Sequence, residues 1–226
     1  MNVHIQQLPQ NTAGTSFATN QMNAVDLNNA AVSASKRGDY AGAVEAHLQA
    51  LNIKERLHGP DSTNTAITAN GLGEEYLKMG DVENADKYIS MALHVRNDTS
   101  HGGLGQGGRF DAAVTRENMA QVREAQGRFL EARKMRLQGQ ATAQIACGNA
   151  SVSLSSVYDP NRPLILPLLQ CPGYTFSAEQ LKRCSGCQCV LYCQVTCQTT
   201  DWRSRHKSLC KKYGAEAVRE LATQTK

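Results

Sequence analysis

The feature that most constrains this chain is a cluster of cysteines near its C-terminal end. Of its eight cysteines, seven fall between Cys171 and Cys210, in a chain of 226 residues. Residues 1–21 lack the basic start and apolar run of a signal peptide, and no stretch is long enough to span a bilayer. We therefore expect an intracellular protein of the nucleus or cytoplasm, with reduced thiols. In such a compartment, dense cysteines indicate a bound metal more often than disulfides.

The spacing of this cluster is typical of metal ligands. From Cys184 to Cys210 the sequence reads Cys-x2-Cys-x5-Cys-x3-Cys-x8-His-x3-Cys. A Cys-x2-Cys knuckle aims two sulfurs at one metal, and x3 spacings place ligands one turn apart on a helix. Thiolate and imidazole ligands favour Zn²⁺, which can stabilise a segment of about 40 residues that is too short for an adequate apolar core. A disulfide framework is the alternative, but it needs an oxidising compartment and does not explain the position of His206.

The residues that flank these ligands make the pattern more specific. They are Tyr192, Gln198, Asp201, Trp202 and Lys207. With them, residues 171–210 resemble an MYND-type zinc finger. The resemblance implies two zinc ions, one of them held by Cys184, Cys187, His206 and Cys210. It also implies a protein–protein interaction module that takes short proline-containing peptides. We expect the two aromatic residues, as in most small domains, to belong mainly to the module core.

The second zinc site implied by the resemblance is one ligand short. An upstream Cys-x2-Cys would pair with Cys193 and Cys197, but Cys171 is followed three residues later by Tyr174. We predict Cys171, Cys193 and Cys197 as ligands. The fourth position stays open, the alternatives being a water molecule, no ligand at all, or one of the remaining cysteines, Cys147 and Cys189. A single upstream cysteine is also typical of a plain buried thiol.

Residues 22–144 carry a weak internal repeat. Gly38, Gly80 and Gly127 are each followed five residues later by alanine and preceded seven residues earlier by a small residue. A glycine of this kind ends a helix in the left-handed conformation, and small residues let two helices approach closely. The pattern predicts three helical hairpins. Their expected apolar stripe comprises Leu27, Leu48, Leu51, Leu72, Ile89, Leu93, Met119 and Met135.

These hairpins resemble tetratricopeptide repeats. The resemblance is carried best by Leu72, Gly73, Tyr76, Ala85 and Ala92. The glycines at 38, 80 and 127 are spaced by 42 and 47 residues, similar to the kinesin-light-chain type of repeat. The third repeat departs from the pattern, since Arg123, Arg136 and Gly139 stand where a tyrosine, an aromatic residue and an alanine are usual. A generic bundle of alanine-rich hairpins is the alternative.

The predicted fold is therefore mostly α, a TPR-like array of helical hairpins followed by a small zinc-stabilised module. The expected parts are a disordered tail (1–21), the repeats (22–144), a linker rich in serine and proline (145–170), the finger (171–210) and a basic helix or tail (211–226). Residues 102–108 formally contain GxGxxG. They follow a helical segment rather than a strand, so we interpret them as a loop between repeats.

The residues favour an adaptor over an enzyme. The six histidines are scattered, no carboxylate stands at a spacing typical of acid–base chemistry, and the chain has no room for the SET methyltransferase domain that can accompany MYND fingers. We predict a non-catalytic protein that docks proteins or short peptides, with no membrane partner. The alternative is a nucleic-acid-binding or transcriptional regulatory protein, because the chain from Cys171 onward has nine Lys or Arg against four Asp or Glu.

Overall fold

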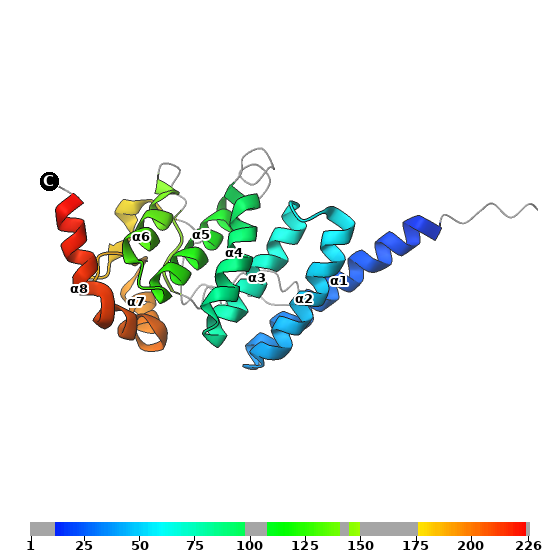
Figure 1. The fold of residues 1–226 in the computed structure, drawn as a ribbon, viewed down its shortest axis with the longest axis horizontal. Helices are drawn as coiled ribbons and strands as arrows, with labels where there is room; N and C mark the ends of the chain where they lie inside the picture. Colours follow the sequence, from blue (N-terminus) through cyan, green and yellow to red (C-terminus); the bar gives the residue numbers. More distant parts are fainter. Residues whose placement is uncertain (1–11, 98–107, 141–144, 150–175, 225–226) are drawn as a thin grey trace, which may run out of the picture.

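The computed structural model describes residues 12–97, 108–140, 145–149 and 176–224. Antiparallel helices follow one another along the long axis of the molecule, and the cysteine-rich module lies at the end opposite the start of α1 (Figure 1). The helices of the array are α1 (Thr12–Lys36), α2 (Tyr40–His58), α3 (Thr63–Met79), α4 (Val82–Asn97), α5 (Gly108–Ala125) and α6 (Phe129–Leu137). The predicted fold class, a helical-hairpin array followed by a small Cys/His module that could hold zinc, is confirmed.

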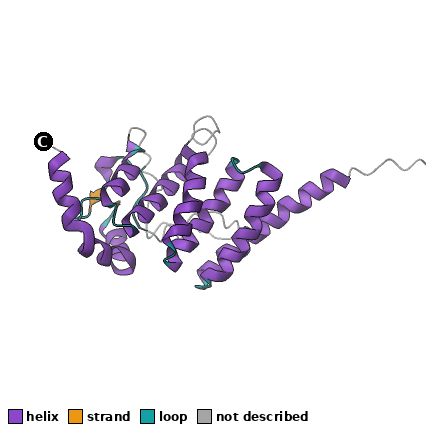
Figure 2. Ribbon diagram, in the orientation of Figure 1, coloured by secondary structure: helices purple, strands orange, loops and turns teal. Residues whose placement is uncertain are grey.

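The C-terminal module contains little strand. The short strands β1 (Lys182–Arg183) and β2 (Leu191–Tyr192) pair antiparallel, with Lys182 opposite Tyr192 (Figure 2). A 3₁₀ turn (Ala178–Gln180) precedes them. Helix α7 (Val195–Asp201) runs through a π-helical turn (Trp202–His206) into α8 (Lys207–Gln224). Among the helices of the described ranges, none has the length and apolar character that crossing a bilayer requires.

The hairpin turns form as the glycine pattern predicts. Gly38, Gly80 and Gly127 have φ angles of 83°, 78° and 80°, in the left-handed region where a side chain would add strain. After α3, the Asp81 amide donates to the Tyr76 carbonyl at 2.9 Å, which satisfies a carbonyl left free at the helix end. At the start of α3, the Ser62 side chain accepts from the Thr65 amide. The glycines and caps together fix where each helix of the array stops and the next begins.

Small residues hold the helices of each hairpin together. The alanines after the three glycines are fully buried, and so are the small residues before them: Ala31, Ala43, Gly73, Ala85, Ala120 and Ala132. The predicted apolar stripe is wrong at Leu48, whose side chain is 38% exposed. Leu48 falls on the outer face of α2 because His47, Leu51 and Lys54 occupy the buried one. The apolar stripe is thus narrower on α2 than the sequence suggested.

Gly73 offers a test of this close packing. A Cβ at this position would lie 2.3 Å from Cγ1 of Ile89, on the facing helix α4. We expect Gly73→Ala to lower the free energy of unfolding by roughly 1–2 kcal/mol, because overpacking outweighs the gain of about 1 kcal/mol in helix propensity. Urea denaturation measures this. Combined with Ile89→Ala, the substitution should cost clearly less than the sum of the single variants, and strict additivity would contradict the proposed contact.

Two predicted boundaries differ from the structure. Helix α1 begins at Thr12 rather than near Met22, whereas the sequence predicted disorder through residue 21. The Phe17 ring meets the His58 ring edge-on at 5.8 Å, and Gln21 hydrogen-bonds His58, so the extension of α1 is anchored on the end of α2. Residues 145–149, predicted as the start of a linker, are buried against the C-terminal module. The glycine-rich segment 102–107 and residues 150–175 lie outside the described residues.

Candidate metal centre

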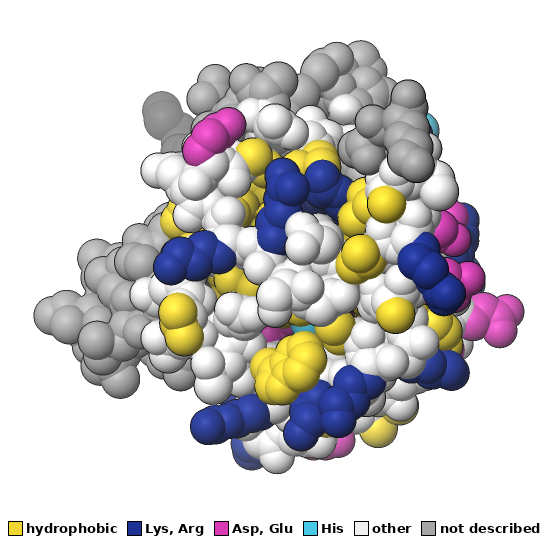
Figure 3. Space-filling model, turned by 90° about the vertical axis from the view of Figure 1, so that its left-hand side faces the viewer, with side chains coloured by type: hydrophobic (Ala, Val, Ile, Leu, Met, Phe, Trp, Pro, Cys, Tyr) yellow, Lys and Arg dark blue, Asp and Glu magenta, His cyan; other side chains and the backbone are white. Residues whose placement is uncertain are grey.

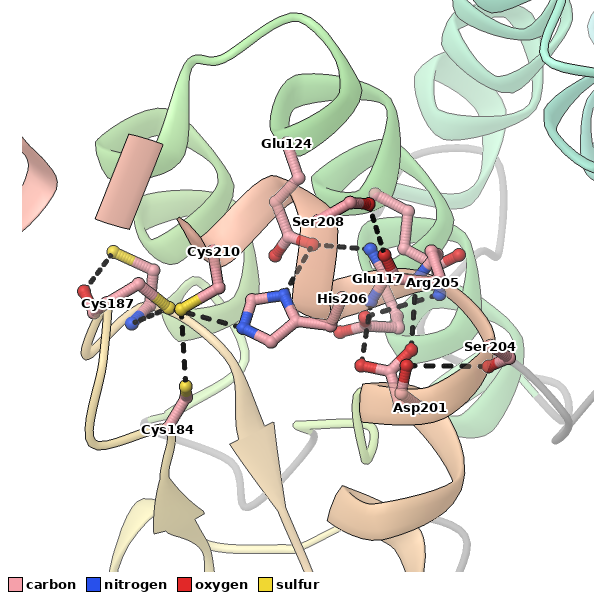
Figure 4. A network of polar contacts seen from close by, with 12 residues as sticks. Glu117, Glu124, Cys184, Cys187, Asp201, Ser204, Arg205, His206, Ser208 and Cys210 are labelled. Atoms are coloured by element: carbon pink, nitrogen blue, oxygen red, sulfur yellow. Dashed lines mark hydrogen bonds and ion pairs between the residues drawn. The ribbon is translucent and has the colours of Figure 1, made fainter. Parts of the chain in front are cut away.

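Four of the predicted ligands come together at one point of the C-terminal module. Cys184 and Cys187 lie on the turn after β1, His206 ends the π-helical turn and Cys210 lies in the first turns of α8 (Figure 4). All four side chains are buried, and their ligand atoms lie within 4.8 Å of one another. The Sγ atoms of Cys184 and Cys210 are 3.8 Å apart, and Cys187 Sγ is 3.5 Å from His206 Nε2. The sequence thus brings three sulfurs and one imidazole nitrogen to a common centre.

Local backbone geometry makes room for these sulfurs. The knuckle closes through hydrogen bonds from the Gln188 amide to the Cys184 carbonyl and from the Cys184 amide to the Val190 carbonyl, at 2.8 and 2.9 Å. A Cβ on Gly186 would lie 2.8 Å from the sulfur of Cys210, so only glycine fits there. Cys-Ser-Gly-Cys is therefore a turn that requires its glycine as well as its two thiols.

The geometry of this group fits a tetrahedral zinc ion. With Zn–S near 2.3 Å and Zn–N near 2.0–2.1 Å, a tetrahedron places two sulfurs about 3.8 Å apart and a sulfur about 3.6 Å from a nitrogen. The separations of 3.8 Å for Cys184–Cys210 and 3.5 Å for Cys187–His206 agree with these values. A disulfide would require about 2.05 Å, and the cysteines of the described residues are free thiols. The donor set therefore suits zinc and not a disulfide framework.

A second group contains three thiols. Cys193, after β2, and Cys197, in α7, have Sγ atoms 3.5 Å apart. The third thiol is Cys147, and the three sulfurs lie within 4.8 Å of one another. Cys171, predicted from the sequence as the third ligand, lies outside the described residues. Cys189, the other alternative, belongs to neither group, and its thiol donates to the Cys187 carbonyl at 3.1 Å.

A buried network of ion pairs lies directly beside the first group. Arg136, on α6, makes a two-pronged contact with Glu117 of α5, each N–O distance being 2.7 Å. Arg136 also donates to Glu124 of α5 and, at 3.1 Å, to the carbonyl of Cys189 in the C-terminal module. Arg136 is 2% exposed, so water does not solvate its guanidinium, and its charge is stabilised by its protein partners instead.

The network continues into the π-helical turn of the module. Arg205 donates to Glu124 at 2.5 Å and to both oxygens of Asp201 at 3.0 Å. Asp201 also accepts from the Tyr192 hydroxyl at 2.7 Å. The Asp-Trp pair of the MYND pattern therefore has a structural role, because its aspartate fixes the arginine that reaches across to the repeats. Both aromatic residues belong to the module core as predicted: Tyr192 is fully buried, and Trp202 packs partly buried against the same cluster.

Glu124 connects this network to the metal group. Its carboxylate lies 3.8 Å from Nδ1 of His206, on the side of the ring opposite Cys187 (Figure 4). Burial on its own would raise the pKa of the Glu124 carboxyl, but the charges of Arg136 and Arg205 outweigh it and lower that pKa to about 2. At 3.8 Å the carboxylate makes no hydrogen bond to Nδ1, so it acts on the imidazole through its negative charge alone.

Sequence reasoning did not identify these ion pairs as part of the site. One signal was present, since Arg136 replaces the aromatic residue expected in a third tetratricopeptide repeat. The structure gives the reason for the departure, because the position faces carboxylates of α5 and the backbone of the module. Glu117 and Glu124 gave no such signal. Both are acidic residues of one helix, and the sequence does not indicate whether such side chains face solvent or a buried partner.

Comparison with known families matches two segments of the chain. Residues 22–98 match the tetratricopeptide repeat model, and residues 170–210 match the MYND finger model. The chain is therefore a helical-repeat protein. In particular, it combines tetratricopeptide repeats with a C-terminal MYND zinc finger, as the residue patterns indicated. Helices α5 and α6 lie outside the repeat match, in keeping with the altered positions of the third repeat.

Similarity to a curated protein is confined to a short segment. Over 30 residues, 13% of this chain, it is 57% identical to Ubiquitin carboxyl-terminal hydrolase 19 of Arabidopsis thaliana. The segment spans 4% of that protein's length. The two matched families are typically interaction modules rather than catalytic domains, and both fit a role in binding other proteins.

Proposed function

We propose that this protein is a non-catalytic adaptor that docks partner proteins through short peptides. In this proposal, zinc is a structural cofactor that shapes the MYND finger. Its ligands are Cys184, Cys187, His206 and Cys210 at one site, and Cys171, Cys193 and Cys197 at the other. A Cys-rich ligand set binds the metal tightly and leaves it little Lewis acidity, which suits a structural role.

The observation that supports an adaptor best is the buried network between the third helical hairpin of the array and the finger. Arg136 and Arg205 join α5 and α6 to the finger, through a fully buried side chain in Arg136 and a largely buried one in Arg205. The Phe129 ring of α6 also packs 5.9 Å from the Tyr213 ring of α8. Modules joined in this way present their surfaces in one fixed arrangement, so a partner could contact both with little loss of entropy.

The exposed face of the finger has the chemistry to receive a peptide. Lysine and arginine side chains lie among hydrophobic groups on this end of the molecule (Figure 3). A shallow hollow of about 330 Å³ is lined by Trp202, Arg203, Ser204, Arg205, Lys207, Ser208 and Lys211. A proline ring can stack on the half-buried indole, and acidic residues beside that proline would complement the basic rim. We therefore favour a proline-containing peptide with acidic flanks.

A direct binding experiment tests this function. We expect fluorescently labelled proline-containing peptides to bind the zinc-loaded chain, and their proline-to-alanine versions to bind more weakly. Trp202→Ala should reduce affinity by about tenfold or more, as truncation of a central aromatic anchor does. Arg219→Ala, on an exposed part of α8 outside the hollow, is the matched control. Unchanged zinc content would show that each variant retains the folded finger.

The nucleic-acid alternative predicts a different result in the same assay. Affinity for labelled DNA or RNA duplexes would fall steeply between low and physiological salt, with a slope set by the number of phosphates contacted. The affinity of a peptide held by aromatic and hydrogen-bond contacts would fall much less over the same change in salt concentration. Strong, salt-dependent duplex binding without any proline-dependent peptide binding would contradict the adaptor function.

A further inference from the structure

The second thiol group includes a cysteine that lies outside the matched finger. Cys147 precedes residues 170–210, yet its sulfur lies within 4.8 Å of the sulfurs of Cys193 and Cys197. The Cys193 amide is 3.5 Å from the Cys147 sulfur. The three side chains come from two separate stretches of chain, so their meeting is a property of the tertiary fold.

Residues 145–149 are held in place by hydrogen bonds on both sides of Cys147. Before it, Ile145 and Phe176 exchange two backbone hydrogen bonds of 2.9 and 3.1 Å. After it, the Gly148 amide donates to the Leu191 carbonyl at 2.7 Å. A Cβ at Gly148 would lie 2.4 Å from a methyl of Val190, so glycine permits this close approach. All five residues are buried. Residues 145–149 are therefore an ordered part of the C-terminal module rather than a linker between domains.

We propose that Cys147 is a ligand of a second zinc ion, together with Cys193 and Cys197. This inference rests on the proposed structural role of zinc, and it extends the metal-binding unit upstream of the MYND finger to Ile145. Cys147 then occupies the position that the sequence leaves open, where the expected cysteine is replaced by Tyr174.

The chemistry of the group favours this assignment over a plain buried thiol. Cys147 belongs to the buried core cluster of the module, but its sulfur also meets two other sulfurs, which a cysteine that only fills space need not do. The Cys193–Cys197 separation of 3.5 Å is close to the edge of a zinc–thiolate tetrahedron and far from a disulfide bond length. Cys189 does not compete for this role, because its thiol points to the Cys187 carbonyl.

Metal stoichiometry of the full chain tests the inference. Zinc per chain is measured by mass spectrometry after purification under reducing conditions. We expect two zinc ions for the unaltered chain and close to one for Cys147→Ser. In Cys147→Ser the affinity of the second site for zinc should fall by more than roughly 10–100-fold. A fall of that size is typical when the residue removed only supports a ligand and does not itself bind the metal. Cys189→Ser, a buried cysteine in neither group, is the control and should retain both ions.

If Cys147→Ser folds poorly, two measurements on the unaltered chain still test the inference: the absorption of the Co²⁺-loaded form and the alkylation of its thiols. In the unaltered chain loaded with Co²⁺, the thiolate charge-transfer absorption should exceed that of a single three-thiolate, one-imidazole site. During slow chelation, alkylation should reach Cys147 in the same kinetic phase as Cys193 and Cys197. Two zinc ions in Cys147→Ser, or alkylation of Cys147 independent of the metal, would overturn the inference. One zinc ion in the unaltered chain would overturn it while leaving the adaptor function intact, whereas no zinc at all would contradict both.

Discussion

Removal of zinc by a strong chelator is expected to unfold the C-terminal module while the hairpins of α1 to α4 keep their helices. Six of the ten buried residues in the core cluster of the module are cysteines: Cys147, Cys184, Cys187, Cys189, Cys197 and Cys210. Structural zinc contributes about 10–16 kcal/mol in zinc-finger peptides, more than so small a core can replace. The repeats are expected to keep their structure without metal, because the buried residues of their clusters are Ala, Leu, Ile, Val and Met.

The single tryptophan makes this result easy to measure. Trp202 is the only tryptophan of the chain, and its ring lies 5.9 Å from the His206 ring. Its emission should shift to longer wavelength on chelation, and backbone amides of 176–224 should exchange faster with solvent. Cys187→Ser should behave like the chelated chain, whereas Cys189→Ser should not. A module that keeps its emission and its exchange protection under a strong chelator would disprove the role given to zinc here.

Arg136→Ala is expected to lower the free energy of unfolding by about 3–5 kcal/mol. The substitution leaves the buried carboxylate of Glu117 without its guanidinium partner, and leaves Glu124 with Arg205 alone. Arg136→Lys should restore little, because an ammonium group cannot make the two-pronged contact with Glu117. Urea denaturation of the zinc-loaded chain provides the measurement.

A surface arginine of the same hairpin provides the control. Arg128 pairs with Glu131, and these side chains are 47% and 53% exposed. Arg128→Ala should therefore change stability by no more than about 1 kcal/mol. Equal stability of the two alanine variants would mean that the buried network contributes nothing.

Much of the array could be predicted from the sequence because its signals are local. A glycine that must adopt positive φ ends a helix wherever it stands, so Gly38, Gly80 and Gly127 fixed three turns. Small residues such as Gly73 recur where helices cross, and this recurrence shows in the sequence. Leu48 was misplaced because its hydrophobicity does not indicate which side of α2 faces the neighbouring helices. The extension of α1 to Thr12 depends on contacts with His58, far along the chain.

The first metal group could also be predicted from the sequence, because its signals are local as well. Its knuckle and its His-x3-Cys pair are short-range patterns, which Zn²⁺ selects by ligand type and spacing. The full set of residues in the second group could not be predicted from the sequence, because these residues lie on segments that only the folded chain brings together. Cys147 meets Cys193 through backbone contacts of Ile145 and Gly148 with residues far downstream. Spacing alone left the fourth position open to Cys147, Cys189, a water molecule or no ligand at all.

The sequence by itself determined the class of fold, the turns between helices and a Cys/His module suited to zinc, since each depends on residue types at short and fixed spacings. Only the tertiary structure decided how the module is attached to the repeats. Arg136, Glu124 and Arg205 come from three elements, and their charges are tolerable in the interior only because they meet one another there. Such pairing depends on where helices lie in space, which local patterns do not record.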